Sequence, residues 1–255
     1  MSPVDVPFRL DGPADGPPIL LSNSLGTTTE MWDPQIPALA EHFRVIRYDT
    51  RGHGSAPVPD GPYAIDDVGA DAVALLDRLG IERAHVAGVS LGGMTGMWLG
   101  VNAPERVGRL VLICTSAMLA EEHDWPARAR TVREQGTSAI AEATVTRWFT
   151  EGFIAKEPDT VAKLRRALED TPPEGYAGCC EAIAGMDQVD AIGAIDTPTL
   201  VIAGRADPAT PPAHGELIAE RIPGARYELL EAAHLANVER ADEVTRLILS
   251  HLEVR

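Results

Sequence analysis

The sequence predicts an α/β protein with a mostly parallel central sheet, helices on both faces of that sheet, and a helical insertion between two later strands. Three observations support this prediction. Continuous apolar runs alternate with segments of helical spacing as far as Cys114, and fully apolar strands are typical of parallel sheets covered by helices. The alternation stops near Ala117 and resumes at residues 199–203. The length of 255 residues suits one such domain with an insertion.

The order of elements follows from apolar runs, helical spacing and turn residues. A helix is predicted over residues 65–79, because apolar residues recur three and four positions apart and Gly80 stands where a C-cap glycine is favoured. A second helix, over residues 91–103, is expected to stop before Pro104. The other elements are expected at residues 19–21 (strand), 35–42 (helix), 43–48, 85–87, 110–114 and 199–203 (strands), 214–222 (helix), 226–230 (strand) and 242–252 (helix).

The segment between the predicted strands at residues 110–114 and 199–203 has a different character. Residues 117–190 carry many charges and helical stretches without a convincing strand. We therefore predict a helical cap over residues 117–190, inserted into a core formed by residues 1–116 and 191–255. Because open α/β sheets bind ligands at the carboxyl ends of their strands, such a cap would lie over the ligand site.

Charge and cysteine content exclude several classes of function. The chain has 22 Lys and Arg against 38 Asp and Glu, a net charge of −16, which opposes binding to nucleic acid or to anionic lipid. Its three cysteines include one adjacent pair and no CxxC, so neither a disulfide framework nor a structural zinc site is expected. No secretory signal or membrane span is apparent. We expect a soluble cytoplasmic protein without a metal or organic cofactor.

The segment Gly88-Val89-Ser90-Leu91-Gly92 matches the pattern G-x-S-x-G. It lies between a predicted strand and a predicted helix, which is the setting that a nucleophile elbow requires. In so tight a turn a side chain at either glycine would collide with the neighbouring strand or helix. The helix that follows directs its free N–H groups at the serine and favours negative charge there. Ser90 is therefore the predicted nucleophile; the alternative is a glycine-rich turn with an unreactive serine.

A serine nucleophile needs a base, and His234 is the favoured histidine. It follows the predicted strand at residues 226–230, so it lies at the same edge of the sheet as Ser90. In this type of sheet the histidine comes last, after the nucleophile and the acid. His214 is the main competitor, but it begins a helical stretch and suggests a surface position.

The acid partner of the histidine should lie at a strand end between Ser90 and His234. Asp207 directly follows the strand at residues 199–203, and it would hold the imidazole tautomer and stabilise the imidazolium. The alternative role for Asp207 is that of a turn or helix-cap aspartate before Pro208.

An oxyanion hole requires two backbone donors. The N–H of Leu91, directly after the nucleophile, is one predicted donor. The loop at residues 22–26 would supply the other, for which we favour the N–H of Leu25. A side-chain donor from Asn23 or Ser24 is the alternative.

Taken with these motifs, the chain resembles an α/β-hydrolase over its whole length and, more narrowly, the 3-oxoadipate enol-lactonases of the β-ketoadipate pathway. The specific resemblance rests on residues 21–27 (Leu-Ser-Asn-Ser-Leu-Gly-Thr), 47–54 (Arg-Tyr-Asp-Thr-Arg-Gly-His-Gly), 147–150 (Arg-Trp-Phe-Thr), 174–176 (Glu-Gly-Tyr) and 180–183 (Cys-Glu-Ala-Ile). It implies hydrolysis of a small unsaturated lactone that carries a carboxymethyl group, as in bacterial breakdown of aromatic compounds. Many relatives have His-Gly in the loop where this chain has Asn-Ser-Leu-Gly.

An anionic lactone requires local positive charge in so acidic a protein. Cap arginines are the predicted source, with Arg133 or Arg147 favoured over Arg128 and Arg130. The aromatic residues Trp125 and Trp148 are predicted to cover the lactone ring. The alternative is that the arginines pair with acids on the outer face of the cap and that the tryptophans are core residues.

Two other functions stay open on the sequence alone. One is a different serine hydrolase on the same scaffold, such as a carboxylesterase, a perhydrolase or a carbon–carbon bond hydrolase. The other is a ligand-binding receptor that retains the pocket without turnover. The acid, arginine and histidine within residues 49–54 are interpreted as a structural turn.

Overall fold

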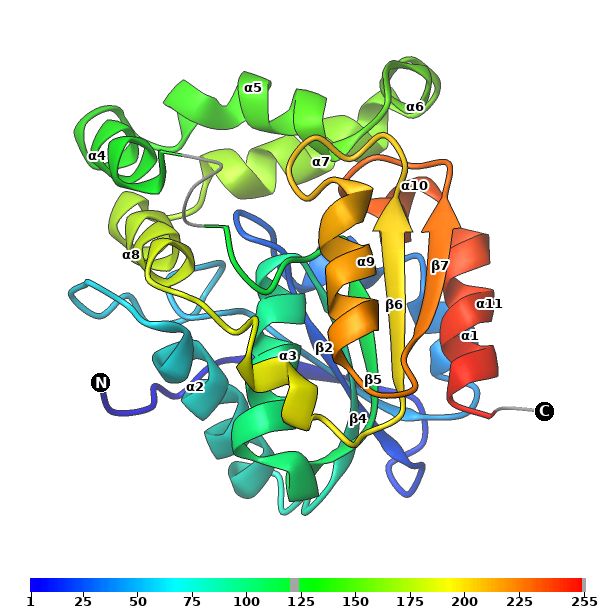
Figure 1. Cartoon of the computed structure of the whole chain (residues 1–255). Helices are drawn as coiled ribbons and strands as arrows, with labels where there is room; N and C mark the ends of the chain where they lie inside the picture. Colours follow the sequence, from blue (N-terminus) through cyan, green and yellow to red (C-terminus); the bar gives the residue numbers. More distant parts are fainter. Residues whose placement is uncertain (120–123, 254–255) are drawn as a thin grey trace.

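A computed structural model describes residues 1–119 and 124–253. Over these residues the chain forms a seven-stranded sheet in the order β1-β3-β2-β4-β5-β6-β7, parallel except for β1, which runs antiparallel to β3 (Figure 1). The strands are β1 (Phe8–Asp11), β2 (Pro18–Ser22), β3 (Arg44–Tyr48), β4 (Ala84–Val89), β5 (Val107–Ile113), β6 (Thr199–Gly204) and β7 (Arg226–Leu230). The predicted mostly parallel sheet is confirmed.

Helices cover both faces of this sheet, as predicted. Helices α2, α3 and α9 lie on one face and α1 and α11 on the other (Figure 1). The central strands are fully buried because both of their faces are covered. The bounds are α1 (Ile36–Leu39), α2 (Ile65–Arg78), α3 (Leu91–Asn102), α9 (Pro212–Arg221), α10 (Ala236–Glu239) and α11 (Ala241–His251), with short 3-10 helices η1 (Thr29–Trp32), η2 (Pro104–Arg106) and η3 (Ala191–Ala194).

The strand β1 is the one element of the sheet that the sequence analysis missed. It is an edge strand, and its apolar residues Phe8 and Leu10 are exposed. A four-residue strand of this kind has neither the continuous apolar run of a buried strand nor a buried alternating face. Its position depends on antiparallel pairing with β3, which is more than 30 residues away in the sequence.

Between β5 and β6 the described chain is helical, and its helices lie over the carboxyl ends of the strands (Figure 1). We refer to them as the cap helices: α4 (Trp125–Gln135), α5 (Ser138–Trp148), α6 (Glu151–Lys156), α7 (Pro158–Glu169) and α8 (Pro173–Ala184). The two ends of this segment meet, because the N–H of Gln188 donates to the carbonyl of Ala117 at 2.9 Å. An isolated bridge between Met118 and Asp187 lies beside that bond.

The cap rests on the core through an unusually close backbone contact. A methyl group on Gly52, in the loop after β3, would lie 2.3 Å from the Cα atom of Gly175 in α8, and the reverse is also true. Only two glycines allow the two backbones to come this close. This contact places α8 directly over the loops at the carboxyl edge of the sheet.

The order of the strands creates the place for a site. Strand β2 has β3 on one side and β4 on the other. The connections that leave β2 and β4 therefore run in opposite directions along the sheet. At such a switch point the loops after the two strands diverge and leave a crevice. The loop after β2 and the loop after β4, which carries Ser90, border this crevice.

Candidate active site

Ser90 sits in a strained turn between β4 and α3. Its φ of 55° and ψ of −116° are uncommon for a residue other than glycine. The turn is held because the Ser90 N–H donates to the carbonyl of Ile113 at 3.0 Å. A methyl group on Gly88 would lie 2.1 Å from the carbonyl oxygen of Gly92, and one on Gly92 would lie 2.1 Å from that of Ser22. Both glycines of the motif are therefore sterically required, as predicted.

His234 and Asp207 meet at the neighbouring strand ends. The loop after β7 carries His234, whose Nδ1 lies 2.8 Å from Oδ2 of Asp207, in the loop after β6. Both side chains are buried, with the histidine 4% and the aspartate 3% exposed. The structure therefore brings together the two residues that the sequence placed 27 positions apart. The competing His214 instead places its Nδ1 2.7 Å from Oγ of Ser116.

Thr210 completes the surroundings of Asp207 and was missed by the sequence analysis. Its hydroxyl donates to Asp207 Oδ2 at 2.7 Å, and its N–H donates to Oδ1 at 3.0 Å. The N–H of Ala209 donates to the same Oδ1 at 2.8 Å. The only sequence signal for this arrangement is the spacing of a threonine three residues after an aspartate in a loop, which is common in turns.

These contacts decide the charge state of Asp207. Burial by itself would raise the pKa of this carboxyl. The charge and hydrogen bond of His234, together with the hydrogen bonds from Thr210, outweigh that effect and lower the pKa below its ordinary value. Asp207 is therefore a carboxylate at neutral pH, and it accepts the proton on Nδ1 of His234, which leaves Nε2 free to act as a base.

The loop after β2 presents one unused N–H group between two that are occupied. The Ser24 N–H donates to Sδ of Met31 at 3.3 Å, and the Gly26 N–H donates to Nε2 of His53 at 2.9 Å. Within the described chain the N–H of Leu25 has no acceptor. This arrangement is compatible with the predicted oxyanion role of Leu25.

The side chain of Asn23 does not take part in the site. It is fully buried, donates to the carbonyl of Tyr48 at 2.8 Å and accepts from Nε1 of Trp32 at 3.1 Å. Asn23 is therefore a structural residue that connects β2, β3 and η1. Ser24, in contrast, lines the cavity beside Ser90.

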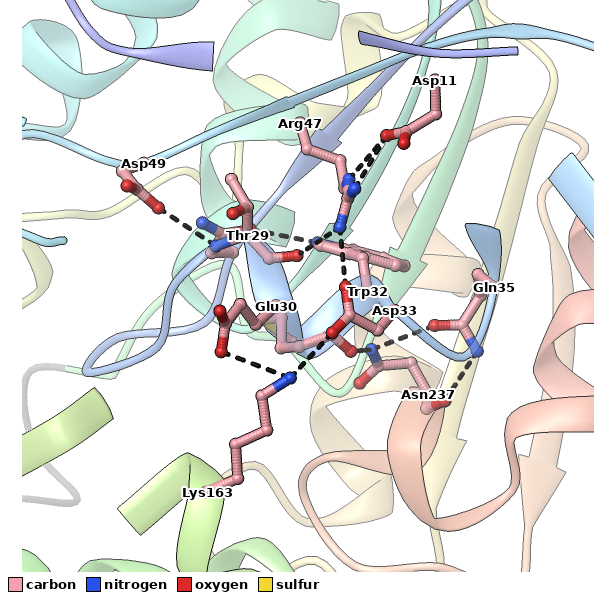
Figure 2. Close-up of polar contacts among 12 residues, drawn as sticks. Asp11, Thr29, Glu30, Trp32, Asp33, Gln35, Arg47, Asp49, Lys163 and Asn237 are labelled. Atoms are coloured by element: carbon pink, nitrogen blue, oxygen red, sulfur yellow. Dashed lines mark hydrogen bonds and ion pairs between the residues drawn. The ribbon is translucent and has the colours of Figure 1, made fainter. Parts of the chain in front are cut away.

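Polar contacts around η1 join it to the sheet and to the cap. Figure 2 shows the guanidinium of Arg47, on β3, between the carboxylates of Asp11 and Asp33, at 2.9 and 2.8 Å. The same figure shows Lys163, on the cap helix α7, beside Asp33 at 2.8 Å and Glu30 at 3.3 Å. Core strand, loop and cap are thus joined at η1 by one network of charges.

A cavity of about 70 Å³ opens between the loops and the cap helices. This volume accommodates several water molecules or one small organic molecule. The cavity brings Ser90, His234 and the oxyanion loop together with side chains of the cap. It is lined by Ser24, Leu25, Ser90, Met94, Leu119, Trp125, Arg128, Thr144, Arg147, Trp148, Tyr176, Ile183, Ala209, Thr210 and His234.

Arg128 is the half-buried cation of this cavity. Its Nε and Nη2 donate to the hydroxyl of Tyr176 at 2.9 and 2.6 Å, and Nη2 also donates to Oγ1 of Thr144 at 2.7 Å. Within the described chain no carboxylate pairs with it. Both hydroxyls that accept from Arg128 are neutral, so these hydrogen bonds position its positive charge without compensating it.

Three of the four predicted substrate-binding residues of the cap line the cavity, and one does not. Trp125, Trp148 and the exposed Arg147 line the cavity, as expected. Arg133 does not. Its guanidinium is held by Glu174 and Glu181 at 2.6 to 3.0 Å, outside the cavity.

A correction therefore applies to Arg133, which was expected to bind substrate. Both of its neighbouring glutamates raise the pKa of its guanidinium, and the ion pairs join α4 to α8. This is the alternative of pairing with cap acids that the sequence analysis left open. Arg128, which precedes Arg133 by five positions on the same helix, is the half-buried arginine of the cavity.

No group of three or more histidine, cysteine or acidic side chains in the described chain is arranged to hold a metal ion. None of the described helices has the length and hydrophobicity of a membrane span.

A sheet of this topology, with a serine at a strained strand-to-helix turn and an Asp–His pair at the ends of two later strands, defines the α/β-hydrolase class. The alpha/beta hydrolase fold family matches residues 17–241, and the chain belongs to that family.

Within this family the chain is similar to several enol-lactonases. The chain is 47% identical to 3-oxoadipate enol-lactonase 2 of Acinetobacter baylyi, over 90% of this chain and 86% of the relative. It is 38% identical to 3-oxoadipate enol-lactonase 1 of the same organism, over 94% and 90%. The crystal structure of the enol-lactonase from Burkholderia xenovorans LB400 superimposes with a TM-score of 0.97 at 42% identity, covering 98% of this chain and 97% of that one.

Proposed function

We propose that this protein is a carboxylic-ester hydrolase of the β-ketoadipate pathway that opens 3-oxoadipate enol-lactone to 3-oxoadipate. One observation carries the proposal: a single small cavity holds the Ser90 and His234 side chains together with the guanidinium of Arg128, which no carboxylate within residues 1–119 and 124–253 pairs with. The first two supply ester hydrolysis, and the third supplies recognition of a carboxylate. The similarity to proteins named 3-oxoadipate enol-lactonase supports the same substrate.

The first half of the reaction forms an acyl-enzyme. His234 Nε2 removes the hydroxyl proton of Ser90, whose oxygen attacks the lactone carbonyl. The N–H groups of Leu25 and Leu91 stabilise the resulting oxyanion. When the ring C–O bond breaks, the leaving oxygen is an enolate, a better leaving group than a simple alkoxide, and His234 returns the proton to it.

The second half releases the product. His234 activates a water molecule that attacks the acyl-enzyme, and Ser90 recovers its proton. The enol product then tautomerises to the more stable ketone, which makes the reverse reaction unfavourable. In both halves Asp207 stabilises the imidazolium of His234.

The cap residues position the substrate. Arg128 binds the substrate carboxylate, and the Tyr176 hydroxyl, which accepts from Arg128, retains its own proton to donate into the cavity. Arg147 adds a second positive charge at the cavity. Trp125 and Trp148 lie against the flat ring. We propose that residues 117–190 act as the substrate-binding cap of a core formed by residues 1–116 and 191–255.

The proposed partner is therefore a small anionic lactone, with no nucleic acid and no membrane partner. We place the reaction in the cytoplasm, since Cys114, Cys179 and Cys180 are all free and buried, which suits a reducing compartment.

The test is steady-state kinetics on 3-oxoadipate enol-lactone and on a neutral aryl acetate. We expect the lactone to have a kcat/KM at least ten-fold higher. Ser90→Ala should lower kcat by several orders of magnitude, because members of a catalytic triad act as a unit. A protein that hydrolyses the aryl acetate but not the lactone would be a general carboxylesterase, and a folded Ser90→Ala variant with undiminished activity would exclude Ser90 as the nucleophile.

A further inference from the structure

His53, interpreted from the sequence as part of a structural turn, contacts the oxyanion loop. It lies in the loop after β3, is 1% exposed, and none of the chemistry described above uses it. Its Nε2 is 2.9 Å from the backbone nitrogen of Gly26, and its Nδ1 is 3.1 Å from the carbonyl oxygen of Arg51. The imidazole thus connects two loops that belong to different strands.

These two contacts define the protonation state of the ring. A backbone N–H can only donate, so Nε2 must accept from Gly26 and carries no proton. The carbonyl of Arg51 can only accept, so Nδ1 carries the proton and donates to it. Both hydrogen-bonding positions of the neutral ring are therefore satisfied. An imidazolium would place an N–H group against the Gly26 N–H and break that bond.

We propose that His53 is a positioning residue of the oxyanion hole, which holds the Leu25 N–H in place through the adjacent peptide of Gly26. The proposal rests on the oxyanion role of Leu25 in the proposed function. It assigns His53 to the stabilisation of the transition state rather than to general support of the fold.

The geometry of the loop explains why an acceptor is needed there. Ser24 to Thr27 form a turn closed by two bonds to the Ser24 carbonyl, from the N–H and the hydroxyl of Thr27. Gly26 has a φ of 77°, in the left-handed region that glycine tolerates. The peptide between Leu25 and Gly26 is the central peptide of this turn, and it can flip by changing ψ of Leu25 and φ of Gly26.

His53 prevents that flip. If the central peptide reversed, the carbonyl of Leu25 would replace the Gly26 N–H opposite the unprotonated Nε2, and two acceptors would face each other in a buried site. The Leu25 N–H belongs to the preceding peptide, between Ser24 and Leu25, which lies between two anchored groups: the Gly26 N–H held by His53 and the Ser24 N–H held by Met31. Fixed donors are what an oxyanion hole requires, because they need no reorganisation when negative charge develops.

Burial of the ring favours this neutral state. Burial lowers the pKa of His53, more than the backbone bond to Arg51 and the negative charge of Asp49 raise it. Arg51, in the same loop, is itself neutralised by a buried ion pair with Asp71 at 2.6 Å. On the cap side the ring of Tyr176 lies 6.4 Å away, centroid to centroid.

A pair of matched amide variants tests the proposal. The side chain of His53→Gln reaches the position of Nε2 and can accept from Gly26, whereas that of His53→Asn reaches only the position of Nδ1. We expect His53→Asn to lower kcat/KM on the lactone by about 10- to 100-fold with little change in KM, less than the loss of an oxyanion donor itself. His53→Gln should recover most of this loss, and His42→Gln, at an exposed site, is the control.

A second measurement separates positioning from stability. Boronic acids form a tetrahedral adduct with an active-site serine, so their inhibition constant reports on the oxyanion hole without turnover. We expect the inhibition constant of phenylboronic acid to rise in His53→Asn by the same factor as kcat/KM falls, and to stay near the wild-type value in His53→Gln. Equal behaviour of the two variants, or an unchanged boronate constant in His53→Asn, would overturn the proposal.

The boronate measurement also keeps the two proposals distinguishable. It needs only a reactive Ser90 and an oxyanion hole, so it tests His53 even if the natural substrate is not the lactone. Failure of wild-type protein to hydrolyse the lactone would contradict the proposed function and leave the comparison of the boronate constants intact.

Discussion

Arg128 is the residue on which substrate selectivity is expected to depend. It faces the cavity, and its positive charge has hydroxyl partners but no carboxylate partner in the part of the chain described. We predict that Arg128→Ala raises KM for the anionic lactone roughly 10- to 100-fold, because a hydrogen bond to a charged group is worth about 1.5–3 kcal/mol. Hydrolysis of a neutral aryl acetate should be almost unchanged.

Arg130→Ala is the matched control for this prediction, because Arg130 lies on the same helix but is exposed and does not line the cavity. Its kinetic constants should stay at wild-type values on both substrates. If Arg128→Ala impaired hydrolysis of the lactone and of the aryl acetate to the same extent, Arg128 would be supporting the fold of the cap rather than recognising a carboxylate.

Helix α10 and the junction of α5 with α6 hold the loop of His234 between them. The carboxylate of Glu239 accepts from the N–H of Ala233 at 3.0 Å, from the N–H of Thr150 at 3.3 Å and from the hydroxyl of Thr150. On the other side of His234, the N–H of Leu235 donates to the carbonyl of Trp148 at 2.9 Å. Both neighbours of the predicted base are thus connected to the cap. Leu235 binds Trp148 directly, and Ala233 is linked to Thr150 through Glu239.

We predict that Glu239→Ala lowers kcat about ten-fold on both the lactone and the aryl acetate, because three donors lose their shared acceptor and the His234 loop loosens. Glu239→Gln should retain most of the activity, since its amide oxygen can accept the two N–H bonds and its NH₂ group can donate to the Thr150 hydroxyl. Steady-state kinetics of the two variants gives the comparison. A loss confined to the lactone would assign Glu239 to substrate binding instead.

Buried and half-buried histidines contribute to the acid response of the whole molecule. Burial lowers the pKa values of His53, His85 and His251, so these side chains stay neutral in the folded protein at a pH where they are protonated in the unfolded chain. The unfolded state then binds more protons, so the free energy of unfolding falls as the pH drops below about 6.5, by up to about 1.4 kcal/mol per pH unit for each histidine. Above that pH both states are neutral and the effect vanishes.

We predict a lower midpoint of urea unfolding at pH 5.5 than at pH 7.5. The net charge of −16 acts in the opposite direction, because acid reduces self-repulsion, so the experiment is best run in 0.5 M salt, where repulsion is screened. His251→Gln should weaken the pH dependence and His42→Gln should not. A midpoint that rises on acidification in high salt would mean that protonation of the buried histidines does not control the acid response.

Features that depend on residues close together in the chain were predictable from the sequence. Apolar runs and helical spacing predicted strands β2 to β7 and the main core helices in the order that the structure has, but not β1 or α10. The tight turn around Ser90 was predictable because its two glycines and the flanking strand and helix are contiguous in the sequence. Chain order also singled out His234 and Asp207, whose side chains do meet, and their catalytic roles stay a proposal.

Contacts between residues far apart in the chain could not be predicted in this way, because they depend on how the elements pack. Arg128 and Arg133 lie on one helix and cannot be ranked by spacing, because their roles depend on where α4 packs against α8 and on Glu174 and Glu181, more than 40 residues further along the chain. The pairing of β1 and the contact of His53 with Gly26, 27 residues apart, are of the same kind. Periodicity reports which face of an element is buried, but the partner on the other side of that face is chosen by packing across the whole molecule.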